Sequence, residues 1–144
     1  MKTPIDLTQQ ERYDIVCYRI KNAEKTLGEI EHLIALKYYN TAANRMYYSC
    51  YYAACALLIA YKVNTKSHDG VKQMFSQRFI KTGILPMHLS RIYSTLFKQR
   101  LSGDYDDMFD NTFESVNELY PQACEFITTI KEMVDQWLAE NNKD

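Results

Sequence analysis

The chain has 144 residues, 47% of them apolar and 24% charged, values typical of a globular domain with a single core. A formal net charge of -1 excludes attraction to nucleic acid through an overall positive field, so such binding would need a local basic patch. No apolar run reaches the roughly 20 residues that span a bilayer, and the N-terminus has no signal-peptide core. We therefore expect one cytoplasmic domain over residues 1–144, with no membrane contact.

No motif in the chain predicts a metal or a cofactor. The four cysteines include no pair two residues apart, which excludes a zinc knuckle, and they fit small apolar side chains in a reducing compartment. The sequence contains no glycine-rich phosphate loop, no paired metal-binding histidines and no nucleophile motif. His32 and His88 have no partner at ligand spacing, so we expect both on helix surfaces.

The first predicted element is a long amphipathic helix from Thr8 to about residue 37. Thr8 and Glu11 form a capping box, and apolar residues then recur at intervals of three and four. Gly28 can bend this helix, and Asn40 can end it or cap the next one. A tight turn at that point would make the first two helices antiparallel neighbours.

A second helix is predicted over about residues 41–61, and its composition makes it the buried central element. Nearly all of its residues are apolar or small, apart from Asn44 and Arg45. Small side chains recur along it at helical spacing, which lets another helix approach closely. These side chains are Ala42, Ser49, Ala53, Ala56 and Ala60.

The third and fourth helices follow a loop at residues 63–66. Ser67 is a good N-cap for the third helix, and Gly83 marks its end. The fourth helix carries an apolar stripe over residues 89–101, and we expect residues 102–104 to stop it.

The last helical segment begins between Phe109 and Phe113 and keeps its apolar stripe as far as Trp137. Pro121 should kink or divide it, because proline lacks the amide donor and crowds the preceding turn. No stretch alternates as a half-buried strand does. The sequence therefore predicts an all-α, up-and-down bundle of about five helices.

Arg45 is the first candidate binding residue, because no acidic residue close in sequence neutralises it. Tyr52 follows seven residues later, close to two helical turns, so Arg45, Tyr48 and Tyr52 share one face. A guanidinium group can hold a phosphate and a tyrosine ring can stack a base, as in contacts to nucleotides or RNA. The alternative is an ion pair between Arg45 and an acid on another helix.

Arg100 and Asp104 form the second candidate, at the end of the fourth helix. Arg100 falls on the edge of the apolar stripe, so we expect it to point into the bundle. Asp104 lies one turn further on. It either pairs locally with Arg100 or reaches across to Arg45.

The third candidate is the segment 67–70, at the start of the third helix. Backbone donors and the helix dipole favour an anion at such a position. A simple cap by Ser67 is the plainer interpretation. In the functional interpretation, His68 acts as an acid or base near neutral pH.

Four short motifs follow one another along the chain, with helices predicted between them. They are Asn44-Arg45-x-Tyr47-Tyr48-x-x-Tyr51-Tyr52-Ala53-Ala54-x-Ala56-Leu57-Leu58, Ser67-His68-x-Gly70-Val71, Phe79-x-x-Thr82-Gly83 and Arg100-x-x-x-Asp104-Tyr105. Together they resemble the HEPN domain family. The resemblance covers nearly the whole chain, and it implies a bundle of about five helices that pairs as a homodimer.

Many HEPN proteins are metal-independent endoribonucleases whose motif is an arginine, four to six residues, and then a histidine, with two copies meeting at the dimer interface. Arg45 matches the arginine, but Tyr52 stands where the histidine would be. A phenol with a pKa near 10 is a poor base at neutral pH, so this departure removes the expected acid or base. The resemblance also implies a small nucleotidyltransferase as a partner, as in a toxin–antitoxin pair, and nucleotide binding in some members.

Three hypotheses follow. We favour a dimeric binding module for a nucleotide, RNA or a nucleotidyltransferase partner. The second hypothesis is a ribonuclease toxin in which His68 or Tyr52 replaces the usual histidine, and the third is an assembly module in which Arg45 pairs with Asp104. The candidate ligand-binding residues are Asn44, Arg45, Tyr48, Tyr52, His68, Arg100 and Asp104.

Overall fold

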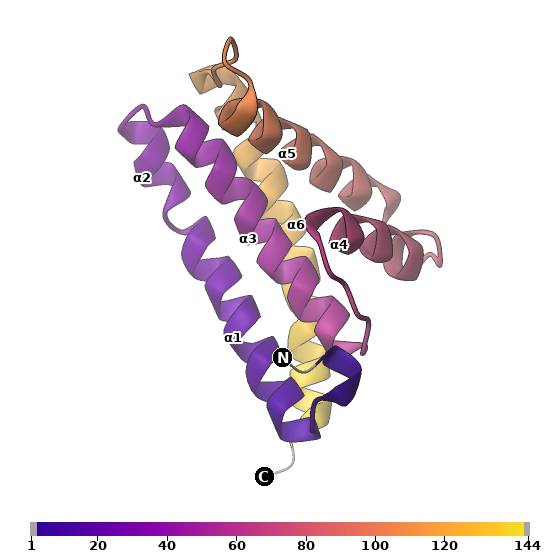
Figure 1. Ribbon diagram of the computed structural model, residues 1–144. Coiled ribbons are helices and arrows are strands. Elements are labelled where there is room, and N and C mark those ends of the chain that lie inside the picture. The colour runs from indigo at the N-terminus through magenta and orange to yellow at the C-terminus, as the bar shows by residue number, and fades with distance from the viewer. Residues whose placement is uncertain (1–2, 143–144) are drawn as a thin grey trace.

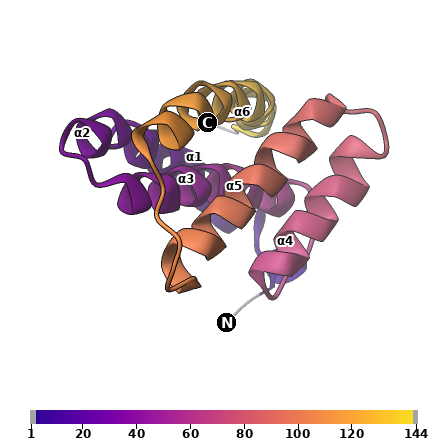
Figure 2. The same ribbon diagram turned by 90° about the horizontal axis from the view of Figure 1, so that it is seen from above.

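The computed structural model describes residues 3–142, and α3 (Tyr39–Ala60) is its central helix. Helices α1, α5 and α6 pack around α3, and α4 lies beside α5 at one edge (Figures 1 and 2). Their bounds are α1 Gln9–Leu27, α2 Ile30–Ala35, α4 His68–Phe75, α5 Met87–Tyr105 and α6 Phe113–Asn141. The described residues contain no strand, which confirms the predicted all-α bundle.

Helix α3 can occupy the centre because its side chains are apolar or small on nearly every face. Its buried positions include six alanines, together with Met46, Tyr47 and Leu57. Small side chains allow close approach of the neighbouring helices, as the sequence predicts. The buried core therefore follows α3 along its length.

The first predicted helix is present as two helices, α1 and α2. The Thr8 capping box starts α1 as predicted. The chain then turns at Gly28, whose amide donates to the carbonyls of Glu24 and Thr26, and α2 begins two residues later. The bend expected at Gly28 is thus a complete break in the helix.

Arg12 ties the start of α1 to the end of α3. It is 2% exposed, and its Nη1 donates to the carbonyl of Ile59 at 3.0 Å while Nη2 donates to that of Leu7 at 3.3 Å. Ile59 lies in the last turn of α3, where the helix dipole favours a cation, and its carbonyl also accepts a hydrogen bond from the backbone amide of Lys62 at 3.1 Å. Arg12 therefore caps the central helix through its side chain.

Asn40 neither ends a helix nor caps one, so that prediction is wrong. The N-cap position belongs to Tyr38, and Asn40 lies inside the first turn of α3. Its Oδ1 accepts hydrogen bonds from the backbone amide and the side-chain amide of Asn111, at 2.8 and 3.0 Å. Asn40 therefore pins the loop between α5 and α6 to the start of α3.

Helix α5 runs through residues 102–104, where the sequence predicts a stop, and ends at Tyr105. Gly103 is helical. A Cβ there would lie 2.9 Å from Asn111 Nδ2 and 3.3 Å from Asn40 Oδ1. Glycine is thus required by the close approach of the loop, and it does not act as a helix terminator.

Ser67 caps α4 as predicted, by accepting a hydrogen bond from the amide of Gly70. The helix continues as a π-helix, η2 (Ser76–Ile80), which the sequence did not indicate. Gly83 then adopts a φ of 79°, consistent with its predicted place just after the helix.

Helix α6 begins at Phe113 and is not divided by Pro121, which lies inside it. Of the described helices, none is both long enough and apolar enough to cross a membrane.

Replacing Gly103 with alanine tests the contact with the loop. Alanine favours a helix by about 1 kcal/mol over glycine, but its Cβ would displace Asn111 and break two hydrogen bonds to Asn40. We expect Gly103→Ala to lower the free energy of unfolding in urea by about 1 kcal/mol. Gly28→Ala is the matched control. The new Cβ would lie 3.4 Å from the carbonyl oxygen of Lys25, which is an ordinary contact, so the free energy of unfolding should stay the same or rise slightly. Equal effects of the two changes would contradict this account.

Candidate functional site

Seven side chains from three helices form one connected group beside the middle of α3, which we call the tyrosine–arginine cluster. Each member has an aromatic or cation–π contact with at least one other. The members are Arg45, Tyr47, Tyr48, Tyr51 and Tyr52 of α3, His68 of α4 and Arg100 of α5.

Arg45 and Tyr52 flank Tyr48 on α3, as their spacing predicts. The guanidinium carbon of Arg45 lies 5.5 Å from the ring centroid of Tyr48, and the rings of Tyr48 and Tyr52 are 6.0 Å apart. All three side chains are partly exposed. The face identified from the sequence is therefore open to solvent.

Arg100 points into the bundle, as predicted, and is only 7% exposed. Its guanidinium carbon lies 4.8 Å from the ring centroid of Tyr47 and 5.8 Å from that of Tyr48. Its Nε has no hydrogen-bond partner, and within residues 3–142 no carboxylate forms an ion pair with it. Arg100 is thus a buried cation held by aromatic rings without a counter-charge.

The two ion pairs considered from the sequence are both absent within residues 3–142. Asp104 instead accepts a hydrogen bond from Asn44, with 2.9 Å between Asn44 Nδ2 and Asp104 Oδ2. Neither Arg45 nor Arg100 pairs with this carboxylate. The expectation that Asp104 neutralises one of the arginines is wrong, because its side chain is exposed and bonded to an amide.

His68 joins the cluster from the N-terminus of α4. Its Nδ1 is 2.7 Å from the hydroxyl of Tyr47, and its ring stacks on Tyr51 with a centroid distance of 4.4 Å. Tyr48 meets the same imidazole edge to face at 5.7 Å. His68 is therefore fixed against three tyrosines, and it is not a fully exposed residue of a first turn.

Burial shifts the proton equilibria of this group. It raises the pKa of Tyr47 to about 12, so the phenol keeps its proton near neutral pH. Burial also lowers the pKa of His68, and the positive charge of Arg100 lowers it further, while Asp69 acts in the opposite direction. The hydrogen bond between Tyr47 and His68 thus joins two neutral groups at pH 7.

Two residues at the centre of the cluster, Tyr47 and Tyr51, were absent from the sequence-derived site. Both stand in the segment that suggested the site, at the i and i+4 positions that share a helix face. They belong to the cluster because they contact His68 and Arg100, which come from other helices. Periodicity alone marks such residues only as core.

Tyr105, the last residue of α5, extends the cluster towards solvent. Its ring centroid lies 6.0 Å from the guanidinium carbon of Arg100, and the residue is 72% exposed. An accessible ring therefore stands beside the buried cation. In the described part of the chain, no group of three or more His, Cys, Asp or Glu side chains is arranged to hold a metal ion.

Comparison with known proteins places these features in a family. The family model of the HEPN domain matches residues 16–133, a span that includes every member of the cluster. A UPF0332 protein of Thermotoga maritima is 29% identical over 125 residues, covering 87% of this chain and 95% of the relative.

Two proteins of Methanocaldococcus jannaschii are also similar to the chain. "Putative toxin MJ0142" is 34% identical, over 78% of this chain and 76% of its own length. "Putative toxin MJ0605" is 30% identical, over 83% of this chain and 88% of its own length. The match over most of the chain, the all-α bundle and the four motifs agree, and the chain belongs to the HEPN domain family.

Proposed function

We propose that this HEPN domain has a toxin-like role in which the tyrosine–arginine cluster binds the phosphate of a nucleotide or of RNA. One observation carries the proposal: Arg100 is buried with no counter-charge among residues 3–142, beside a second arginine on the same tyrosine ring. The names of two relatives as toxins support the role.

The electrostatics of the cluster favour an anionic ligand. Burying a cation away from water is costly unless a partner offsets the lost hydration, and the aromatic rings around Arg100 offset about 0.5–2 kcal/mol. Arg45 adds a second positive charge near Tyr48, and the two like charges repel. A phosphate bound by both guanidinium groups would remove the repulsion and fill the vacant donor of Arg100.

Aromatic residues at the edge of the cluster suit a base attached to that phosphate. Tyr105 is exposed beside Arg100, and Tyr52 is partly exposed beside Tyr48. Stacking of a base on a tyrosine ring contributes about 1–3 kcal/mol and tolerates any base. The cluster would therefore bind nucleotides with little sequence preference.

We also propose that the chain acts as a homodimer and associates with a nucleotidyltransferase, as the family resemblance implies. Light scattering on the purified protein tests the first point. Co-purification with a nucleotidyltransferase encoded by an adjacent gene tests the association with this partner.

Ribonuclease activity is the second candidate function, and the position of His68 favours it. Tyr52 replaces the histidine of the family motif, but His68 supplies an imidazole from another helix, beside Arg100. If the phenol of Tyr47 donates to His68 Nδ1, then Nε2 carries a proton and can donate to phosphate. If Nδ1 donates to the phenol, Nε2 is free to act as a base.

Arg100→Met separates a binding role from a structural one. Removing an unpaired buried charge while keeping similar volume should leave the free energy of unfolding unchanged or raise it by about 1 kcal/mol. Binding of AMP, ATP and a short RNA should weaken about tenfold or more, because a charge-assisted contact is lost. Calorimetry and urea titration measure the two effects.

Arg91→Met is the matched control, since Arg91 is an exposed arginine of the same helix and should change neither quantity. Strong destabilisation by Arg100→Met with unchanged binding would show that Arg100 is structural. Absence of any nucleotide or RNA binding by the wild type would reject the proposed function.

The pKa of His68 tests the proximity of Arg100 in solution. Because the folded-state pKa lies below the unfolded value of about 6.5, the neutral form stabilises the fold, and this stability is lost as the pH falls below about 6.5. NMR titration of the imidazole should give a value under 6.5 in the wild type and a higher value in Arg100→Met. A pKa that does not respond to Arg100→Met would argue against their contact.

RNA integrity in cells that express the chain tests the ribonuclease candidate. Cleavage should be lost in His68→Gln and retained in His32→Gln, because His32 is exposed on α2, away from the cluster. Intact RNA at high expression of the wild type would reject this second function and leave the binding role.

A further inference from the structure

We propose that the groove between α4–η2 and α5 binds the sugar–phosphate backbone of a single-stranded polynucleotide that continues from the tyrosine–arginine cluster. The inference rests on the proposed function and specifies its ligand as a strand long enough to occupy the cluster and the whole groove together. It arises from three observations: the polar lining, the order of the cations, and the burial of the rings beneath.

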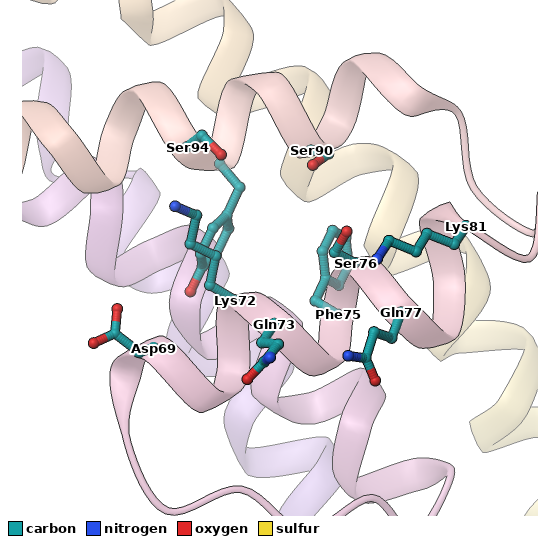
Figure 3. A pocket seen from close by; sticks show the side chains of 10 residues that line it. Asp69, Lys72, Gln73, Phe75, Ser76, Gln77, Lys81, Ser90 and Ser94 are labelled. Atoms are coloured by element: carbon teal, nitrogen blue, oxygen red, sulfur yellow. The ribbon is translucent and has the colours of Figure 1, made fainter.

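The groove has a volume of about 490 Å³ and is lined mostly by polar side chains (Figure 3). Lys72 rises from α4 towards α5 at one end, and Lys81 reaches back towards Ser76 at the other (Figure 3). The two lysines therefore stand at opposite ends of the groove. Of the described residues that line the groove, Asp69 is the one with an acidic side chain.

Cation–π contacts connect this groove to the cluster. Lys72 Nζ lies 5.0 Å from the ring centroid of Phe97, and the guanidinium carbon of Arg100 lies 5.7 Å from the same centroid. Arg100 in turn shares the ring of Tyr48 with Arg45. The positive charges therefore follow one another in the order Arg45, Arg100, Lys72 and then Lys81, which is a track for a chain of phosphates.

Most polar side chains of the groove are free to form hydrogen bonds with a ligand. Within residues 3–142 five side chains of the lining form no hydrogen bond with another protein group, so they are available to sugar hydroxyls and phosphate oxygens. They are Gln73, Ser76, Gln77, Ser90 and Ser94. Two of them belong to η2, and π-helical turns are frequent at functional sites.

The aromatic residues of the groove are too deeply buried to stack a base. Phe75 and Tyr93 line its floor, yet each is only 1% exposed. The groove thus offers charge and hydrogen bonds without an accessible ring, which suits the backbone of a strand. Base stacking is confined to Tyr52 and Tyr105 of the cluster and its edge.

The test compares a labelled oligouridylate of about 12 nucleotides with AMP, each titrated against the full chain at several salt concentrations. In Lys72→Gln/Lys81→Gln we expect about tenfold weaker oligouridylate binding and a salt-dependence slope reduced by about 1.4, or about 0.7 for each lost phosphate contact. AMP binding should stay within about twofold of the wild type, since AMP occupies only the cluster. Asp69→Asn should strengthen oligouridylate binding, because it removes the acidic group of the groove.

Lys21→Gln/Lys25→Gln is the matched control, because it removes two exposed lysines from α1, away from the groove. An equal loss in this control would show a non-specific charge effect and overturn the inference. A second outcome would overturn the inference but keep the proposed function. In it, AMP binding depends on Arg100, and the wild type binds oligouridylate no more tightly than AMP. If Lys72→Gln/Lys81→Gln abolishes the binding of both AMP and oligouridylate, and the control variant abolishes neither, the inference is also overturned and the groove is assigned to a small phosphorylated ligand.

Discussion

The burial of α3 on nearly all sides is the constraint on which the rest of the structure depends. Its alanines and Ser49 present little volume, so α1, α5 and α6 can pack closely against one helix. Arg12 satisfies a carbonyl at the C-terminal end of α3, and Asn40 holds the α5–α6 loop at the other end. Arg12 thus joins the C-terminal end of α3 to α1, and Asn40 joins its N-terminal end to the loop that follows α5, the helix that carries Arg100.

The cluster lies on the face of α3 that carries the tyrosines. His68 and Arg100 pack against this face, and Arg45 and Tyr52 are partly exposed to solvent. A buried arginine without an acid is unfavourable for folding, and aromatic rings compensate only in part. In the proposed function this loss of stability accompanies a prepared anion-binding position, a common compromise at functional sites.

The cluster shows what surrounds Tyr52, the tyrosine that stands in place of the histidine of the family motif. Tyr52 stands at the histidine position and contacts Tyr48, whereas the imidazole of the cluster comes from the start of α4. Arginine and histidine therefore still occur together, although the chain brings them from separate helices. The low pKa of His68 and the high pKa of Tyr47 keep both groups neutral, so the positive charge of the cluster resides on the arginines at pH 7.

The sequence by itself determined the helices, the central place of α3 and the face that carries Arg45, Tyr48 and Tyr52, because apolar periodicity and capping residues act over a few residues. It also placed His68 at the start of one helix and Arg100 near the end of another. The break at Gly28, the continuation of α5 through Gly103 and the role of Asn40 could not be read from it, since each depends on contacts with distant segments. Only the tertiary structure decided that Arg100 packs on Tyr47 without a carboxylate and that Asp104 bonds to Asn44, because ion-pair partners are selected by the packing of helices far apart in the chain.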